Sequence, residues 1–170
     1  MAYDGAMTKG VAADLDPLAL ERQVCFALAI TNRAVLAVYR PLLEPLGLTH
    51  PQYLVMLTLW DHAKTNGEPL TVKGIAGLLQ MDSATLSPML KRLQALGLIT
   101  RSRSETDERT THVELTPKGR NLRRQALKVP PAVVERLGVE LGELEHLHEV
   151  LTSINAAALG AGALDSELDR

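Results

Sequence analysis

The chain has 170 residues, of which 46% are hydrophobic and 22% charged, and its formal net charge is −2. This composition is globular and excludes a chain that is mainly disordered. A single cysteine, Cys25, excludes an intramolecular disulfide framework and fits a reducing cytoplasm. No uncharged apolar stretch approaches the ~18 residues of a membrane span, and residues 1–15 do not resemble a secretory signal. We therefore expect a cytoplasmic protein without a membrane segment.

The charges are unevenly distributed along the chain. Between Asp82 and Lys128 there are ten Lys or Arg and five Asp or Glu, a local net charge of +5, which leaves −7 for the rest. A basic segment inside an acidic protein is the pattern expected when one surface meets a polyanion such as nucleic acid. A solvated helix face with chance clustering is the alternative.

The first part of the chain reads as helical. Asp16 and the proline after it predict a helix that runs to about residue 40, where Pro41 should end it. Residues 41–47 predict a short helical corner that ends in a glycine. The segment 49–62 then predicts a further helix, followed by a loop.

Two short helices with a tight link come next, over residues 72–79 and 83–96. Asp82 caps the second helix and Gly97 closes it. This is the helix-turn-helix layout, in which the second helix enters the major groove of DNA. Pro88 lies inside that second helix and predicts a bend or a loosened first turn, not two separate helices.

Residues 98–103 and 110–115 alternate in polarity around a charged turn, and they predict a β-hairpin, or wing. A basic helix should follow over residues 117–128, with an interruption by Val-Pro-Pro at 129–131 and a last helix over 133–159. The predicted fold is mainly α with a small β-hairpin wing, a winged helix-turn-helix.

The apolar terminal helices cannot all pack on so small a module. Burying them against a second copy gives a symmetric homodimer, which matches the two-fold symmetry of palindromic DNA sites. The predicted organisation is a flexible segment 1–15, a single chain 16–159 with dimerisation helices in 16–62 and 117–159 around the winged helix-turn-helix 70–116, and a frayed tail 160–170.

The wing and its flanks closely resemble the MarR family of bacterial winged-helix regulators, in the segments GLITR at 97–101, DER at 107–109 and LTPKG at 115–119. The resemblance implies that Asp107 braces Arg109 at the tip of the wing. A guanidinium there can enter the narrow minor groove of DNA.

Four further segments resemble the OhrR branch of that family, the organic-hydroperoxide-sensing repressors: 23–28, 39–43, 48–57 and 82–90. The resemblance implies that Cys25, at the family's reactive position, is oxidised to a sulfenic acid by an organic hydroperoxide. Because the chain has no second cysteine, the sulfenic acid must meet a small-molecule thiol, a backbone nitrogen or further oxidation.

In that branch, two tyrosines of the partner subunit hydrogen-bond the reactive cysteine. Tyr39 matches one of them, and His50 stands at the other position, where an imidazole can also donate. Cys25 and Tyr39 are fourteen residues apart, roughly 21 Å along one helix. They share a face but cannot touch within one chain, so the thiol site is expected at the subunit interface.

The predicted DNA contacts come from the second helix and the wing. Short hydroxyl side chains at a helix start suit phosphates and base edges, while lysine and arginine hold the DNA backbone. The predicted DNA-binding residues are Ser83, Thr85, Ser87, Lys91, Arg92, Arg101, Arg103, Asp107 and Arg109.

We therefore predict a dimeric repressor that leaves a pseudo-palindromic operator in double-stranded DNA when Cys25 is oxidised. One alternative is a MarR-type repressor released by a small aromatic ligand. Another is a one-cysteine peroxidase, but the sequence supplies no acidic or basic partners for turnover, so no enzyme is expected. No cofactor is predicted, and no metal site either, because the histidines are scattered and His146 and His148 point to different sides of a helix.

Overall fold

The computed structural model describes residues 16, 18–65, 67–104, 107 and 110–164, which divide into two compact units at the junction of residues 37 and 38. Its elements in chain order are η1 (Leu20–Arg22), α1 (Val24–Leu43), η2 (Glu44–Leu46), α2 (His50–His62), β1 (Leu70–Thr71), α3 (Val72–Leu79), α4 (Ser83–Ala95), β2 (Ile99–Arg103), β3 (Thr111–Leu115), α5 (Pro117–Ala126), α6 (Val129–Leu137) and α7 (Leu141–Gly160).

The first long helix differs from its predicted bounds at both ends, since α1 begins at Val24 and continues to Leu43. Asp16 does not cap it: its carboxylate accepts a hydrogen bond from the Leu18 N–H at 2.9 Å, in a local turn before η1. Pro41 lies inside the last turn. Its missing N–H costs one helical hydrogen bond, and the burial of Leu43, which is 1% exposed, offsets that cost.

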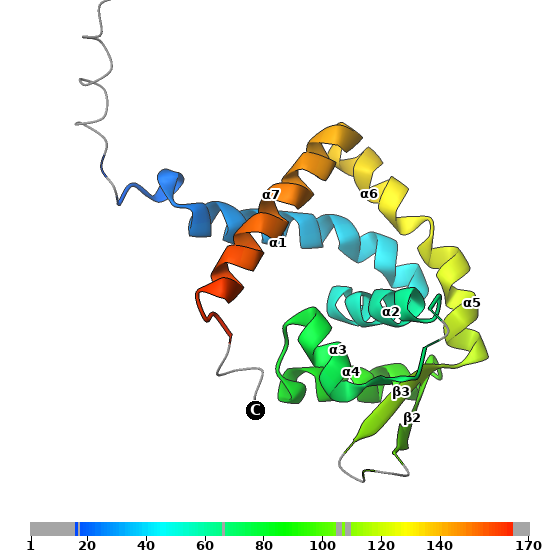
Figure 1. Ribbon diagram of the computed structural model, residues 1–170. Coiled ribbons are helices and arrows are strands. Elements are labelled where there is room, and N and C mark those ends of the chain that lie inside the picture. The colour runs from blue at the N-terminus through cyan, green and yellow to red at the C-terminus, as the bar shows by residue number, and fades with distance from the viewer. Residues whose placement is uncertain (1–15, 17, 66, 105–106, 108–109, 165–170) are drawn as a thin grey trace, which may run out of the picture. The chain divides into compact units, whose positions relative to one another are not determined.

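The helix-turn-helix is confirmed within the second unit, as α3 and α4 (Figure 1). Thr71 caps α3 by accepting from the Gly74 N–H at 2.9 Å, and Asp82 caps α4. One face of each helix is buried in the core that α2 completes. The fully buried side chains of α3 and α4 are Ile75, Leu86, Leu90 and Leu93. In α4 the buried leucines recur at spacings of four and three residues, as one face of a helix requires, and the helix runs through Pro88 without a break into two.

The hairpin is also confirmed, and the structure adds a third strand to it. Strands β2 and β3 pair antiparallel, with Ile99 opposite Leu115, and β1 pairs with the other edge of β3, giving the order β1-β3-β2. The two residues of β1 are too few to show any alternation of polarity, so the sequence did not predict this strand. It joins the entry of α3 to the wing.

The C-terminal region contains a break that was not predicted. Instead of one helix over 133–159, α6 ends at Leu137, Gly138 adopts a left-handed φ of +62°, and α7 begins at Leu141. Glycine takes that backbone conformation without steric cost, which is why the helix can end there. No residue of α7 is buried within the protomer.

By length and composition alone, one helix in the described part of the chain could cross a membrane. The segment Val24–Leu46 has a mean hydropathy of 1.2, and 6% of that window is buried. Arg33 and Arg40 interrupt it, as the sequence indicated. Exposed apolar side chains on a helix fit equally well a face that packs on another protein chain.

Candidate redox site and nucleic-acid interface

The start of α4 is fixed by its own side chains. The Asp82 carboxylate accepts hydrogen bonds from the hydroxyl and the backbone N–H of Thr85, each at 2.7 Å. These hydrogen bonds hold the pKa of Asp82 below its ordinary value. The carboxylate therefore stays ionised and satisfies a backbone donor at the helix start that would otherwise lack a partner.

The solvent side of α4 carries some, but not all, of the predicted DNA contacts. Thr85, Lys91 and Arg92 are exposed, on the side away from the buried leucines. Ser83 and Ser87 are half-buried, and the Ser87 hydroxyl donates to the Ser83 carbonyl oxygen at 2.7 Å. That hydroxyl is thus turned toward the helix backbone, a difference that residue type alone does not reveal.

The wing presents its arginines from β2. Arg103 is exposed, while Arg101 is half-buried, and its Nε has no hydrogen-bond partner among the described residues. Asp107 accepts from the Thr110 hydroxyl at 2.8 Å and from the Thr110 N–H at 2.9 Å, through its carboxylate and its carbonyl oxygen. Arg109 lies outside the described residues, so its bracing by Asp107 stays a prediction.

An aromatic cluster brings together two of the predicted redox residues in one protomer. The ring centroids of Tyr39 and His50 are 5.0 Å apart in an edge-to-face arrangement, and those of Tyr39 and Tyr53 are 6.2 Å apart. Tyr53 was missed by the sequence analysis. It lies one helical turn after His50 on α2, and that spacing is the signal that could have found it.

Burial sets the protonation of this cluster. It raises the pKa of Tyr39, and burial followed by the neighbouring Tyr39 raises the pKa of Tyr53. Burial also lowers the pKa of His50. All three side chains are therefore neutral hydrogen-bonding groups near pH 7, because desolvation disfavours the charged form of each.

Cys25 is exposed and is the second residue of α1. It belongs to the unit of residues 1–37, whereas Tyr39 and His50 belong to the other unit. Because α1 starts later than the sequence predicted, Cys25 lies in the first turn of the helix. The contact of Cys25 with Tyr39 and His50 across a subunit interface stays a prediction.

The lowered pKa of His50 predicts a pH dependence of stability. The unfolded chain takes up a proton at His50 near the ordinary value of 6.5, and the folded chain does so only at lower pH. We therefore expect stability to fall as the pH drops below that value, and to fall less in His50→Gln. Urea midpoints of both proteins at about pH 7.5 and about pH 5.5 measure this difference. Equal losses in the two proteins would contradict the assignment.

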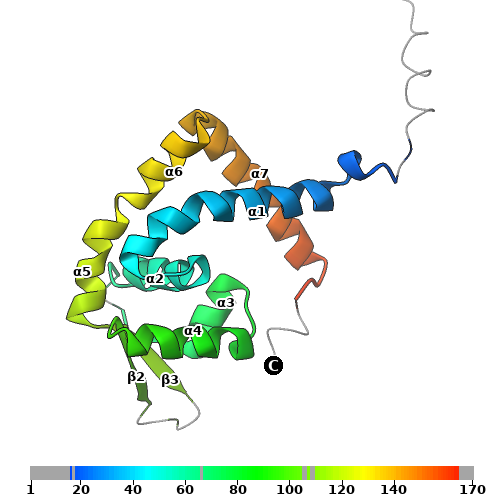
Figure 2. The same cartoon turned by 180° about the vertical axis from the view of Figure 1, so that it is seen from behind.

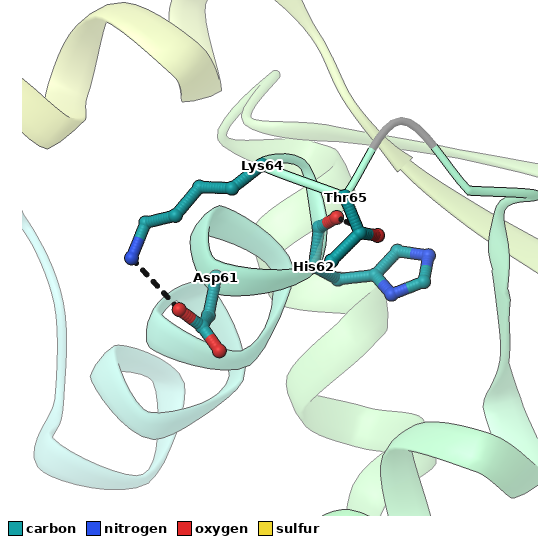
Figure 3. Close-up of polar contacts among 4 residues, drawn as sticks. All are labelled: Asp61, His62, Lys64 and Thr65. Carbon is teal, nitrogen blue, oxygen red and sulfur yellow. Dashed lines mark hydrogen bonds and ion pairs between the residues drawn. The ribbon is translucent and has the colours of Figure 1, made fainter.

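A cleft of about 300 Å³ lies between α2 and the α5–α6 junction. Its walls include Tyr53, Trp60 and Arg123, and its rim carries an ion pair between Lys64 and Asp61 at 2.8 Å (Figure 3). The hydrogen bond from Lys64 holds the pKa of Asp61 below its ordinary value. The cleft therefore has an apolar lining with Arg123 and the Lys64–Asp61 ion pair at its edge.

Comparison with known proteins identifies the family of this chain. The family of the transcriptional regulator SarA/Rot matches residues 37–125, which contain α2, the helix-turn-helix, the wing and nearly all of α5. The chain belongs to the SarA/Rot and MarR-type winged-helix transcriptional regulators. It is accordingly a DNA-binding transcriptional regulator.

Two relatives of this regulator are similar over most of its length. It is 43% identical over 133 residues to the organic hydroperoxide resistance transcriptional regulator of Bacillus subtilis, covering 76% of this chain and 87% of that one. The structure of reduced AbfR bound to DNA superimposes with a TM-score of 0.69 at 32% identity, and it covers 84% of this chain and 94% of the AbfR chain. AbfR comes from Staphylococcus epidermidis. The structure of overoxidised AbfR, also bound to DNA, superimposes with a TM-score of 0.63 at 31% identity. It covers 82% of this chain and 94% of the AbfR chain.

Proposed function

We propose that this regulator is a homodimeric repressor that organic hydroperoxides release from its operator by oxidising Cys25. The observation that carries the proposal is the 43% identity to an organic hydroperoxide resistance regulator, in a chain whose single cysteine lies in the first turn of α1. The same relationship supports a cytoplasmic regulator and not an enzyme.

The sensing reaction involves one thiol and one peroxide. The Cys25 thiolate attacks the outer oxygen of the hydroperoxide, the O–O bond breaks, and the alkoxide leaves as an alcohol after taking a proton. The sulfur is oxidised to a sulfenic acid and the peroxide is reduced. A small-molecule thiol can then displace water from the sulfenic acid to form a mixed disulfide.

Neutral donors around the sulfur would promote the first step. Tyr39 and His50 form one edge-to-face pair, and burial keeps both uncharged near pH 7. An antiparallel crossing of two α1 helices would bring this pair from one subunit to Cys25 of the other. A phenol O–H and an imidazole N–H would then hydrogen-bond the thiolate.

The dimer is supported by apolar side chains that one protomer leaves uncovered. In α7, Leu147, Val150 and Ile154 are each more than 40% exposed, and in α1 Val24 is 63% exposed. Burying each such side chain in a partner contributes roughly 1.5–3 kcal/mol. We propose that these faces of α1 and α7 form the subunit interface and that each subunit presents one α4 to a half-site of double-stranded DNA.

The proposed DNA surface combines α4 with the wing. On α4, Thr85, Lys91 and Arg92 share the solvent side, where Ser83 borders them. Ser87, whose hydroxyl bonds to the helix backbone, contributes less directly. We propose that Arg101, Arg103 and the Asp107–Arg109 element bind the flanking DNA from the wing.

Titration with cumene hydroperoxide tests the proposal. A duplex selected by the reduced protein from a random-sequence pool is labelled, and its binding is followed by anisotropy as peroxide is added. We expect release to saturate at about one peroxide per subunit, because each subunit has one thiol. Consumption of many equivalents indicates a peroxidase, and binding that never changes contradicts sensing. A parallel titration with added cysteine reports whether the mixed disulfide gives the larger loss.

A second candidate is release by a small aromatic ligand, and the cleft between α2 and the α5–α6 junction favours it. Leu57 and Leu127 offer exposed apolar surface to an aromatic ring, while Arg123 could bind an acidic group. Such a ligand would act on the native protein and on a cysteine-free variant alike. Release by a ligand of this class in the absence of peroxide would favour this candidate over the thiol mechanism.

A further inference from the structure

The C-terminal end of α4 is attached to the start of α5 by three hydrogen bonds. The carbonyl oxygens of Leu96, Gly97 and Leu98 follow α4 directly. They accept, in that order, from the Lys118 ammonium at 2.7 Å, the Thr116 hydroxyl at 2.7 Å and the Thr116 N–H at 3.0 Å. We call these five residues the α4–α5 clasp. Three consecutive carbonyl groups after the end of α4, which have no partner within the helix, thus accept hydrogen bonds from two residues at the start of α5.

The backbone at Gly119 packs closely against the Leu98 carbonyl, next to the clasp. Thr116 also accepts from the Gly119 N–H at 3.0 Å, so one hydroxyl both caps α5 and bonds to the end of α4. The Gly119 carbonyl accepts from the buried Trp60 Nε1 at 2.9 Å. A Cβ at Gly119 would lie 2.0 Å from the Leu98 carbonyl oxygen. The start of α5 is therefore held against both α2 and the segment after α4.

The clasp joins the end of α4 to the start of α5, which continues through α6 to α7. Figure 2 shows α5 leaving the base of the β2–β3 hairpin and leading into α6 and α7. A change in how two subunits pack can alter the position of α4 only through elements that join it to those helices. Of these, the clasp bonds directly to the end of α4.

We propose that Thr116 and Lys118 are positioning residues that fix α4 relative to α5 and thereby set the half-site spacing the dimer accepts. The proposal rests on the proposed contact of α4 with DNA in a homodimer, and it is independent of Cys25. Half-sites bound by paired helices are about 34 Å apart, and one inserted base pair shifts and rotates one half-site relative to the other. If α4 is rigidly attached to α5, the dimer cannot follow that shift and binds the altered duplex more weakly.

Lys118 distinguishes positioning from direct DNA contact. It is exposed and contributes to the basic segment, so phosphate binding is the obvious reading. Its ammonium, however, donates to a carbonyl oxygen at the C-terminal end of α4, where a cation is favourable. A lost phosphate contact lowers the slope of log affinity against log salt by about one, whereas a lost positioning bond leaves the slope unchanged.

The test compares Lys118→Met and Thr116→Val with the native protein under reducing conditions. The probes are a duplex selected from a random-sequence pool and the same duplex with one base pair inserted or removed at its centre. We expect Lys118→Met, which loses one hydrogen bond, to bind the selected duplex about five- to tenfold more weakly. Thr116→Val loses two hydrogen bonds, to the Gly97 carbonyl and from the Gly119 N–H, and should weaken binding at least as much. We also expect both variants to discriminate less between the three spacings, with an unchanged salt slope.

Three controls complete the design. Lys91→Met should reduce the salt slope but keep native discrimination between spacings, as a phosphate contact does. Lys118→Arg should restore native behaviour, since a guanidinium can donate to the same carbonyl. Circular dichroism and sedimentation check that each variant is folded and has the native oligomeric state. The proposal would be overturned by a lower slope of log affinity against log salt in Lys118→Met, or by native discrimination between the three spacings in both variants. Neither result would bear on peroxide sensing.

Discussion

Cys25→Ser is expected to bind the operator as tightly as the native protein and to stay bound when an organic hydroperoxide is added. Serine keeps a small polar group at an exposed position but cannot form a sulfenic acid or a mixed disulfide. The native protein should lose affinity by about 5- to 150-fold on oxidation, the usual range of coupling between two sites. Anisotropy titrations of both proteins, with and without cumene hydroperoxide, measure the difference.

Ala29→Ser provides the matched control for this substitution. It places a hydroxyl one turn further along α1, also at an exposed position, and leaves the sulfur in place. We expect it to respond to peroxide as the native protein does. Continued release of the Cys25→Ser protein by peroxide would mean that the sensor is another group. The cleft between α2 and the α5–α6 junction would then be the first place to look for the effector.

Gly119→Ala is expected to lower the free energy of unfolding by about 3 kcal/mol or more. The added Cβ would lie 2.0 Å from the Leu98 carbonyl oxygen and 3.0 Å from its carbonyl carbon, and both are backbone atoms. Neither can move away without disturbing the Thr116 cap or the buried bond from Trp60 to the Gly119 carbonyl. Urea unfolding followed by circular dichroism measures the loss.

Replacing a glycine of α3 by alanine should instead raise the free energy of unfolding. A Cβ at Gly77 would meet no heavy atom within 4 Å. Alanine is the better helix former, so Gly77→Ala should stabilise the protein by up to about 1 kcal/mol. A Gly119→Ala protein with native stability would show that α5 and the segment after α4 can separate, and the clasp would then lose its rigid support.

Local signals in the sequence determined most of the winged helix. Asp82 marked the start of α4 and Gly97 marked its end. The tight link between two short helices indicated the helix-turn-helix, and alternating polarity indicated β2 and β3. Each of these signals is read from residues within one or two turns of one another, so no knowledge of the tertiary structure was required.

The boundaries of other elements were decided by packing. Pro41 was expected to end α1, yet burial of Leu43 carries the helix past it. β1 exists because β3 offers it a free edge to pair with, and two residues have no pattern of their own. Gly138 divides α6 from α7 although the leucines on both sides continue a helical spacing.

The site shows the same division between local and long-range information. The resemblance of short segments to the OhrR branch pointed to Cys25, Tyr39 and His50, and the charge pattern and the helix-turn-helix layout pointed to α4 and the wing, because segments of this length are read locally. Only the tertiary structure placed Tyr53 against Tyr39 and joined Trp60 to Gly119, a pair 59 residues apart. Hydrogen bonds to backbone carbonyls, such as those of the clasp, leave no trace in residue type at the accepting positions. They depend on how closely two backbones approach, and that is decided by the packing of the whole core.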